Sequence, residues 1–145
     1  YEYVKDVDKA LAESTRVLKS GGAFVNVSIL WDYFRFHGAD EKLNNLIHDA
    51  FRAHCYHQML PLELGGKLRE LGYQYITNKS LAFLITRRDQ NSAARHLETM
   101  VASFAVSQGI SASEVKEWRR QLADAEACGH FGFTSYPVLT SAYLK

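Results

Sequence analysis

Cysteine and proline are both scarce in this 145-residue chain, which contains two of each. Cys55 and Cys128 lie far apart in the sequence, which argues against the disulfide framework that holds many small secreted proteins together. No signal-like segment and no apolar run of membrane-spanning length occurs. We therefore expect a reduced, cytoplasmic setting.

The chain also lacks an excess of charge of either sign. Its 17 basic and 16 acidic side chains are scattered without runs, and the formal net charge is +1. This is not the electrostatic pattern of a protein that binds nucleic acid or an anionic membrane. Hydrophobic residues make up 47% of the sequence, which is enough to bury a core. We expect a globular domain whose partner is a small molecule.

The first part of the chain has the pattern of an α/β fold. Apolar residues at helical spacing predict an amphipathic helix over 7–19, and the pair Gly21-Gly22 ends it. The run Ala23–Leu30 is β-rich and almost entirely apolar, which predicts a strand buried on both faces of a parallel sheet. A helix, a glycine turn and a buried strand in this order indicate an α/β architecture.

The rest of the chain alternates between helical and extended patterns. Helices are predicted from Asp40 to an interruption at Pro61, over 62–71, over 91–109, and over 111–128, where Ser111 and Glu114 match a capping box. Two segments are predicted to be extended. They are Tyr73–Arg87, with a kink at Asn78 or Lys79, and 131–144, in which Pro137 indicates an edge, a bulge or a strand end.

Three segments near the start carry a resemblance to a known family. Tyr1–Val7, Leu11–Glu13 and Arg16–Gly22 resemble a segment of class I S-adenosylmethionine-dependent methyltransferases of the ubiquinone-biosynthesis type. Those proteins have the pattern Leu-Glu-(His/Tyr)-Val…Asp, followed by Leu-x-Glu-x-x-Arg-Val-Leu-Lys-Pro-Gly-Gly. Ser20 replaces the usual proline here, which leaves the glycine turn intact. Weaker similarity continues in Trp31-Asp32, 62–73 and 129–145.

The resemblance implies a fold and a place within it. The family has a seven-stranded, mostly parallel, Rossmann-like sheet whose last strand is antiparallel. On that template this chain is the C-terminal part of one methyltransferase domain, with Ala23–Leu30 as the fifth strand, the region 73–87 as the sixth and the terminal segment as the seventh. The two helices predicted within 89–128 become a helical insertion before the last strand, which could cover the acceptor pocket.

The resemblance also implies a cofactor that these residues do not bind alone. The family holds S-adenosylmethionine with a glycine-rich loop and an acidic residue, and no Gly-x-Gly-x-Gly occurs in this sequence. We therefore expect catalysis to belong to an intact parent chain, with a small organic molecule as the methyl acceptor. The isolated chain is expected to bind the cofactor poorly or not at all.

Ligands of open α/β sheets bind beyond the carboxyl ends of the strands, so we look for the site near Tyr3 and just after Leu30. Tyr3 occupies the family position beside the methyl-transfer site and is a candidate for cofactor binding, or else a packing aromatic. Asp32 is a candidate to orient or deprotonate an acceptor hydroxyl, or else a turn cap. The candidates for an apolar acceptor wall are Trp31, Tyr33 and Phe34, although the same rings could pack against the insertion.

Histidines offer a further set of candidates. His54 is a candidate general base, with a satisfied core histidine as the alternative, and His37 is a candidate for substrate binding. His54 and His57 could share a helix face, but no third ligand at a compatible spacing is evident, so no metal site is predicted.

Two other functions stay open on the sequence. Many nucleotide-binding folds share a helix, a glycine turn and a buried strand, so a nucleotide-cofactor oxidoreductase is one alternative. The other is a non-catalytic methyltransferase-like domain used for association through an exposed sheet edge.

Overall fold

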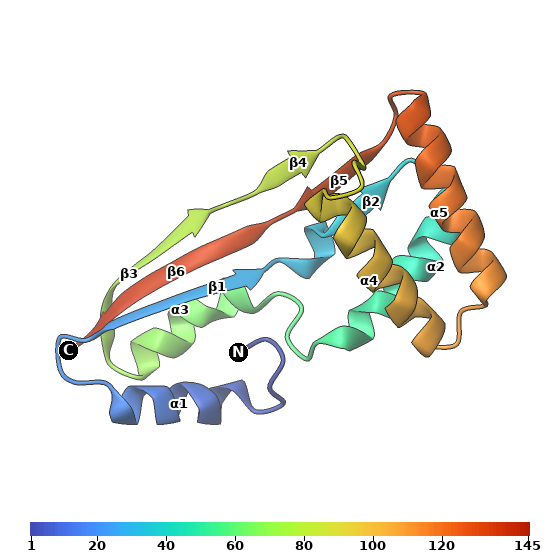
Figure 1. Ribbon diagram of the computed structural model, residues 1–145. Coiled ribbons are helices and arrows are strands. Elements are labelled where there is room, and N and C mark those ends of the chain that lie inside the picture. Colours follow the sequence, from blue (N-terminus) through green and yellow to red (C-terminus); the bar gives the residue numbers. More distant parts are fainter. The chain divides into compact units, whose positions relative to one another are not determined.

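The computed structural model describes residues 1–145 and divides the chain into two compact units. The first unit contains Tyr1–Tyr33, Cys55–Ala82 and Ser135–Lys145, and the second contains Phe34–His54 and Phe83–Thr134. Each unit has a three-stranded sheet of its own together with helices (Figure 1). The protein is thus a mixed α/β structure with two small antiparallel sheets.

The sheet of the first unit has the strand order β1-β6-β3. These strands are β1 (Ala23–Ile29), β3 (Tyr73–Ser80) and β6 (Pro137–Leu144). The last strand, β6, lies between the other two and is antiparallel to both, as Figure 1 shows. An antiparallel terminal strand is what the family resemblance implied. Pro137 is the first residue of β6, which confirms that it marks a strand end, where a missing N–H costs no ladder hydrogen bond.

The predicted surroundings of the first strand are wrong. β1 pairs only with β6, and it does so antiparallel rather than parallel. Its side chains alternate, with Phe24 and Ser28 buried and Val25 and Val27 exposed by 63% and 53%. Valine favours the pleated strand conformation even when one face is open, so the apolar run did not distinguish a central strand from an edge strand.

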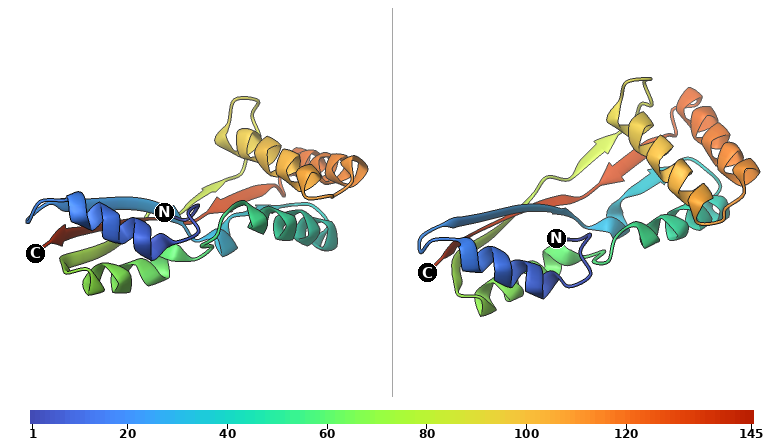
Figure 2. Two further views of the ribbon diagram at one scale, coloured as in Figure 1. Left: turned by 90° about the horizontal axis from the view of Figure 1, so that it is seen from below. Right: turned by 60° about the horizontal axis from the view of Figure 1, so that its bottom comes forward.

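Two helices cover the buried face of this sheet. They are α1 (Val7–Val17) and α3 (Leu60–Glu70), and Figure 2 shows them on the same side of the strands. Their leucines pack with one aromatic residue from each of β1 and β3 in a core that comprises Val7, Leu11, Leu60, Leu64, Leu68, Phe24, Tyr73 and Ala142. Pro61 lies in the first turn of α3, where proline fits, instead of interrupting a longer helix.

The second unit combines short strands with three helices. Its sheet has the order β2-β5-β4, from β2 (Arg35–His37), β5 (Gly132–Ser135) and β4 (Phe83–Ile85). The helices are α2 (Glu41–Phe51), α4 (Ala93–Ser107) and α5 (Ala112–Ala127). The last two are the helices predicted within 89–128, and the capping box at Ser111 is confirmed. Whether 89–128 is an insertion into a methyltransferase domain stays a prediction.

The helix predicted from Asp40 to Pro61 is shorter than expected. α2 ends at Phe51, and one turn of 3₁₀-helix, η2 (Arg52–His54), follows it. A second 3₁₀ turn, η1 (Trp31–Tyr33), follows β1. No helix in the structure combines the length and apolarity that crossing a bilayer requires.

Side chains from α2 satisfy the outer edge of β2. Phe36 is fully buried, and its backbone N–H donates to Nε2 of His48 at 3.1 Å while its carbonyl accepts from the Asn44 side chain at 2.8 Å. Asn44 in turn accepts from the Trp118 indole N–H at 2.8 Å. Asn44 and His48 are four residues apart, so they share one face of the helix. Two buried polar side chains thus take the place of a further strand.

The His48 contact predicts a loss of stability on acidification. Burial, with smaller contributions from Arg35 and His37, lowers the pKa of His48 from 6.5 to about 3. Between these values the unfolded chain binds a proton that the folded chain does not, so stability falls as the pH falls below 6.5. This group alone should lower the free energy of unfolding by about 1.4 kcal/mol between pH 7.5 and 5.5. Urea unfolding at both pH values should show this loss, and His48→Gln should reduce it.

A second prediction concerns an irregularity in β3. The strand register shifts between Gln74 and Thr77, not at the kink predicted at Asn78 or Lys79, and Tyr75 has a φ of 51°. Its side chain is 79% exposed, so little packing opposes replacement. Tyr75→Gly should raise the free energy of unfolding by up to about 1 kcal/mol, because glycine adopts positive φ without strain. The control Lys79→Gly, in a regular part of the strand, should lower it by about 0.5 kcal/mol or more.

Candidate functional site

A buried carboxylate lies at the carboxyl end of β1. Glu2 is only 6% exposed, and its Oε2 accepts a hydrogen bond from the Ile29 N–H at 3.1 Å. The side chains of Trp31 and Tyr3 lie close to this carboxylate and favour its charged form. Glu2 therefore joins the N-terminal turn to the end of the strand and to η1.

The geometry of the strand explains why the carboxylate fits there. Successive N–H groups of a strand point to opposite edges, and the Leu30 N–H donates to the Tyr136 carbonyl at 3.0 Å. The Ile29 N–H must then point to the other edge of β1, which has no partner strand. Glu2 supplies the acceptor that a neighbouring strand would otherwise provide.

The segment that begins at Cys55 fixes the backbone of the turn. The N–H groups of Tyr56 and His57 both donate to the Glu2 carbonyl, at 3.0 and 3.2 Å. Nε2 of His57 lies 3.0 Å from the Val4 carbonyl. The backbone N–H of Trp31 donates to the Gln58 carbonyl at 2.9 Å. Three separate parts of the sequence therefore meet at this site, which we call the Glu2 site: 1–4, 29–33 and 55–58.

The Glu2 site changes the acidity of its two titratable groups. Burial raises the pKa of the Glu2 carboxyl, although the hydrogen bond from the Ile29 N–H and the nearby Trp31 and Tyr3 side chains oppose the rise. Partial burial, together with the negative charge of Glu2, raises the pKa of Tyr3 to about 12. Tyr3 therefore stays protonated at neutral pH and can donate a hydrogen bond. A carboxyl with a raised pKa next to a fixed donor is the kind of pair that can hold or move a proton.

Four of the predicted site residues lie in the first unit. Tyr3 is 56% exposed and Trp31 is 8% exposed, and both contact Glu2. Asp32 is exposed. Tyr33 is 56% exposed, and its ring lies 5.8 Å from that of Tyr136. The structure thus brings Tyr3 and Trp31 together through a residue that the sequence analysis did not select.

A small hollow lies in the same unit, beside the end of β3 and the beginning of β6. Its volume is about 270 Å³, and apolar side chains form most of its wall. Tyr136 lines it, so the Tyr33 ring lies next to one of its walls. Asn78 and Ser80 add two polar groups. This combination suits a small, mostly apolar ligand that has a few hydrogen-bonding atoms.

The other three predicted site residues belong to the second unit. Phe34 is only 4% exposed, and its ring contacts those of Phe133 and Phe51 at 4.9 and 5.6 Å, which are the surroundings of a core residue. His54 is half-buried and stacks on Phe51 with ring centroids 4.1 Å apart, and partial burial lowers its pKa. His37 is exposed, with Nε2 lying 3.2 Å from the Thr134 hydroxyl. No group of three or more His, Cys, Asp or Glu side chains is arranged to hold a metal ion.

Glu2 is the residue that the sequence analysis missed. It belongs to the segment Tyr1–Val7 on which the family resemblance rests, but the resemblance singles out the position of Tyr3 beside it. A glutamate next to two tyrosines ordinarily suggests a solvated surface position, because charged residues are rarely buried without partners. The Ile29 N–H that it accepts from is 27 residues away in the sequence, and the Trp31 side chain next to it is equally remote.

Comparison with known proteins supports the fold alone. No protein-family model matches the chain, and no curated protein matches its sequence. Among solved structures, the YcgJ protein from Bacillus subtilis is similar, with a TM-score of 0.51 and 17% sequence identity. The match covers 99% of this chain and 60% of YcgJ, so the chain spans less than two thirds of the length of that protein.

A substitution at Glu2 tests the geometry of the site. Glu2→Gln removes the negative charge but keeps an acceptor, so the pKa of Tyr3 should fall below 12 while staying above its ordinary value of 10.0, because burial is unchanged. Glu2→Ala, which leaves the Ile29 N–H without its acceptor, should cost about 1–3 kcal/mol of stability. An NMR titration of ¹³C-labelled tyrosine rings follows the first change, and urea unfolding follows the second.

Asp32→Asn is the matched control. The Asp32 carboxyl is exposed and is not among the groups that shift the pKa of Tyr3, so its removal should leave that pKa unchanged. An unaltered Tyr3 pKa in Glu2→Gln would show that the two side chains are not in contact.

Proposed function

We propose that this chain forms the later part of a class I S-adenosylmethionine-dependent methyltransferase that acts on a small organic acceptor. The observation that carries the proposal is the sheet of the first unit. A C-terminal strand lies antiparallel between β1 and β3, and both follow helices as the fifth and sixth strands of the family do. The segment Arg16–Gly22, which carries the most specific part of the resemblance, leads directly into β1.

The position of the Glu2 site supports the same proposal. Ligands of open α/β sheets bind beyond the carboxyl ends of the strands, and the Glu2 site lies at that end of β1. The unpaired edge of β1 is where a preceding parallel strand would complete a Rossmann-like sheet. On this proposal residues 1–4 follow that preceding strand, and two adjacent strand ends meet at Glu2.

The proposed reaction requires little covalent chemistry from the protein. When bound, S-adenosylmethionine supplies a methyl group that is already activated, so the protein mainly aligns the acceptor, excludes water and accepts a proton where the acceptor loses one. The Tyr3 ring would line the methyl-transfer site, with its hydroxyl held by Glu2. Trp31 would support the wall from behind, because it is buried. The exposed Asp32 carboxylate would orient the acceptor or take its proton.

The residues of this chain fit only one side of a cofactor site. Tyr3 offers a half-exposed ring, but no glycine-rich loop and no ribose-binding carboxylate with the family spacing occurs in the 145 residues. We therefore expect isothermal titration calorimetry of this chain with S-adenosylmethionine to give no saturable binding. Micromolar affinity would show that the cofactor is held by residues other than the family's motifs, and would contradict our assignment.

The function itself is tested in the full reading frame that contains this chain. The sequence upstream of Tyr1 should encode a strand that leads into Gly-x-Gly-x-Gly and an acidic residue after the next strand. The encoded protein should release S-adenosylhomocysteine when it is supplied with small hydroxylated or ring-bearing acceptors. Asp32→Asn should then lower kcat by about 10²-fold or more, and Tyr3→Phe should have a smaller effect. A dinucleotide fingerprint upstream would instead support the oxidoreductase.

One observation favours a second candidate function, a non-catalytic association domain. β1 has a free edge, and Val25 and Val27 are exposed beside it. Such an edge can accept a strand from another chain. A degenerate glycine-rich motif upstream, together with a stable complex that Val27→Lys disrupts, would favour this candidate over the enzyme.

A further inference from the structure

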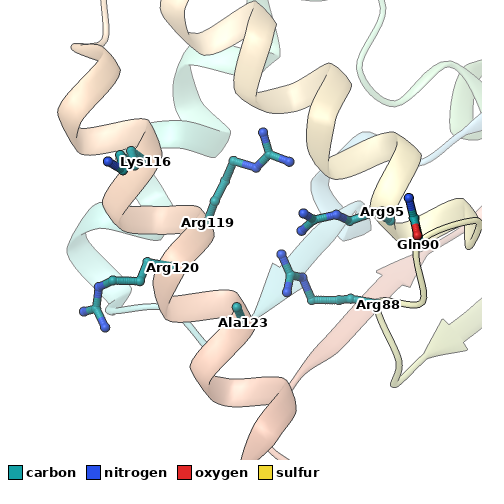
Figure 3. A pocket seen from close by; sticks show the side chains of 7 residues that line it. All are labelled: Arg88, Gln90, Arg95, Lys116, Arg119, Arg120 and Ala123. Atoms are coloured by element: carbon teal, nitrogen blue, oxygen red, sulfur yellow. The ribbon is translucent and has the colours of Figure 1, made fainter.

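A basic cleft lies in the second unit, between α5 and the beginning of α4 together with the segment that precedes it (Figure 3). Its volume is about 620 Å³. Five of the side chains that line it are basic, and none is acidic: Arg88, Arg95, Lys116, Arg119 and Arg120. In a chain whose 17 basic and 16 acidic side chains nearly balance, five basic side chains around one cleft are a local concentration of positive charge.

Three of these guanidinium groups share one buried carboxylate. Glu98 is fully buried and accepts two hydrogen bonds from Arg88, at 2.7 and 2.8 Å. The same carboxylate also accepts from Arg95 at 3.0 Å and from Arg119 at 2.9 Å. Figure 3 shows the ends of these three arginines pointing toward one another from three places in the chain. One carboxylate thus fixes three cations that would otherwise repel.

The nearby carboxylates leave a surplus of positive charge. Besides Glu98, only Glu126 approaches these three arginines, at 3.6 Å from Arg88, so three positive charges face two negative ones. Lys116 adds another positive charge to the wall. Arg120 is paired with two carboxylates, those of Glu117 and Asp124, so the five basic side chains and their four carboxylate partners together leave one surplus positive charge. An anion in the cleft would therefore complete the charge balance.

The three arginines differ in exposure: one is buried, and the other two can reach a ligand. The Arg88 side chain is 4% exposed, whereas those of Arg95 and Arg119 are 37% and 33% exposed. A guanidinium has five N–H donors. Arg95 uses one of them on Glu98, and Arg119 uses one on Glu98 and another on the Thr99 hydroxyl at 3.3 Å. Both therefore keep donors, held in place by a buried acceptor.

We propose that the basic cleft binds a phosphate group, either as the free ion or as the phosphomonoester of a small ligand, mainly through Arg95, Arg119 and Lys116. Guanidinium groups match phosphate oxygens in geometry and donate charge-assisted hydrogen bonds to them. Arg88 and Glu98 act as positioning residues that fix the direction of the other two arginines. The site lies wholly in the second unit and is independent of the methyltransferase proposal.

Calorimetric titration of the full chain tests this site. Inorganic phosphate and phenyl phosphate are titrated separately at constant ionic strength, with potassium chloride as the reference. We expect saturable binding of at least one of the two in the millimolar range or tighter, and stronger binding of phenyl phosphate would identify a phosphomonoester as the ligand. Arg95→Gln and Arg119→Gln should each weaken the binding by about tenfold or more, because each loses a charge-assisted contact. Arg95→Lys, which keeps the charge but not the fork of donors, should be intermediate.

Two further variants make the result decisive. Arg87→Gln removes a positive charge next to Arg88 in the sequence but outside the cleft, and should leave the affinity unchanged within about twofold. Lys116→Gln leaves the Glu98 network intact, so it tests the cleft even if the arginine variants lose their fold, and it should weaken binding severalfold. The absence of saturable binding of both probes, or equal affinity in Lys116→Gln and the wild-type chain, would overturn the proposal.

Discussion

The fold depends on one segment, residues 132–144, which supplies the middle strand of both sheets. β5 lies between β2 and β4, and β6 lies between β1 and β3. A middle strand bonds with neighbours on both sides, whereas each outer strand has a single strand partner. In each unit, the two outer strands come from earlier parts of the chain, and this late segment is the strand that both of them pair with. Because these contacts join residues far apart in the sequence, neither sheet can form before the end of the chain is in place.

Each sheet has an outer strand with a free edge, and different side chains satisfy the backbone groups at these two edges. Along β2, the Phe36 N–H and carbonyl bond to His48 and Asn44, two side chains on one helix face. On β1, one carboxylate satisfies the Ile29 N–H at the end of the strand. In both places side chains form the hydrogen bonds that a neighbouring strand would otherwise form. The polar groups buried there, Glu2 among them, are explained by the backbone groups that they satisfy.

The sequence predicted local features well and their surroundings less well. The first helix, the strand after Gly21-Gly22, the capping box at Ser111 and the strand end at Pro137 all follow from short-range preferences, and all four are present. The parallel environment of Ala23–Leu30 was predicted wrongly, since an apolar run does not reveal which strand lies beside it. The helix from Asp40 was predicted to be too long because no sequence signal near Phe51 indicates that the helix ends there. The same limit applies to the site: Tyr3 and Trp31 were selected from the resemblance, but Glu2 acquires its partners only through tertiary structure.

The two edges also differ in how readily another chain can add a strand to them. The amide and imidazole beside Phe36 occupy the outward-facing hydrogen-bonding positions there, so another chain cannot extend that sheet without displacing them. On β1 only the last N–H is occupied, and the rest of the edge borders on the exposed Val25 and Val27. Open backbone groups next to β-branched side chains are the template on which cross-β fibres grow. Of these two edges, the one at β1 is therefore the edge that offers backbone groups to an added strand.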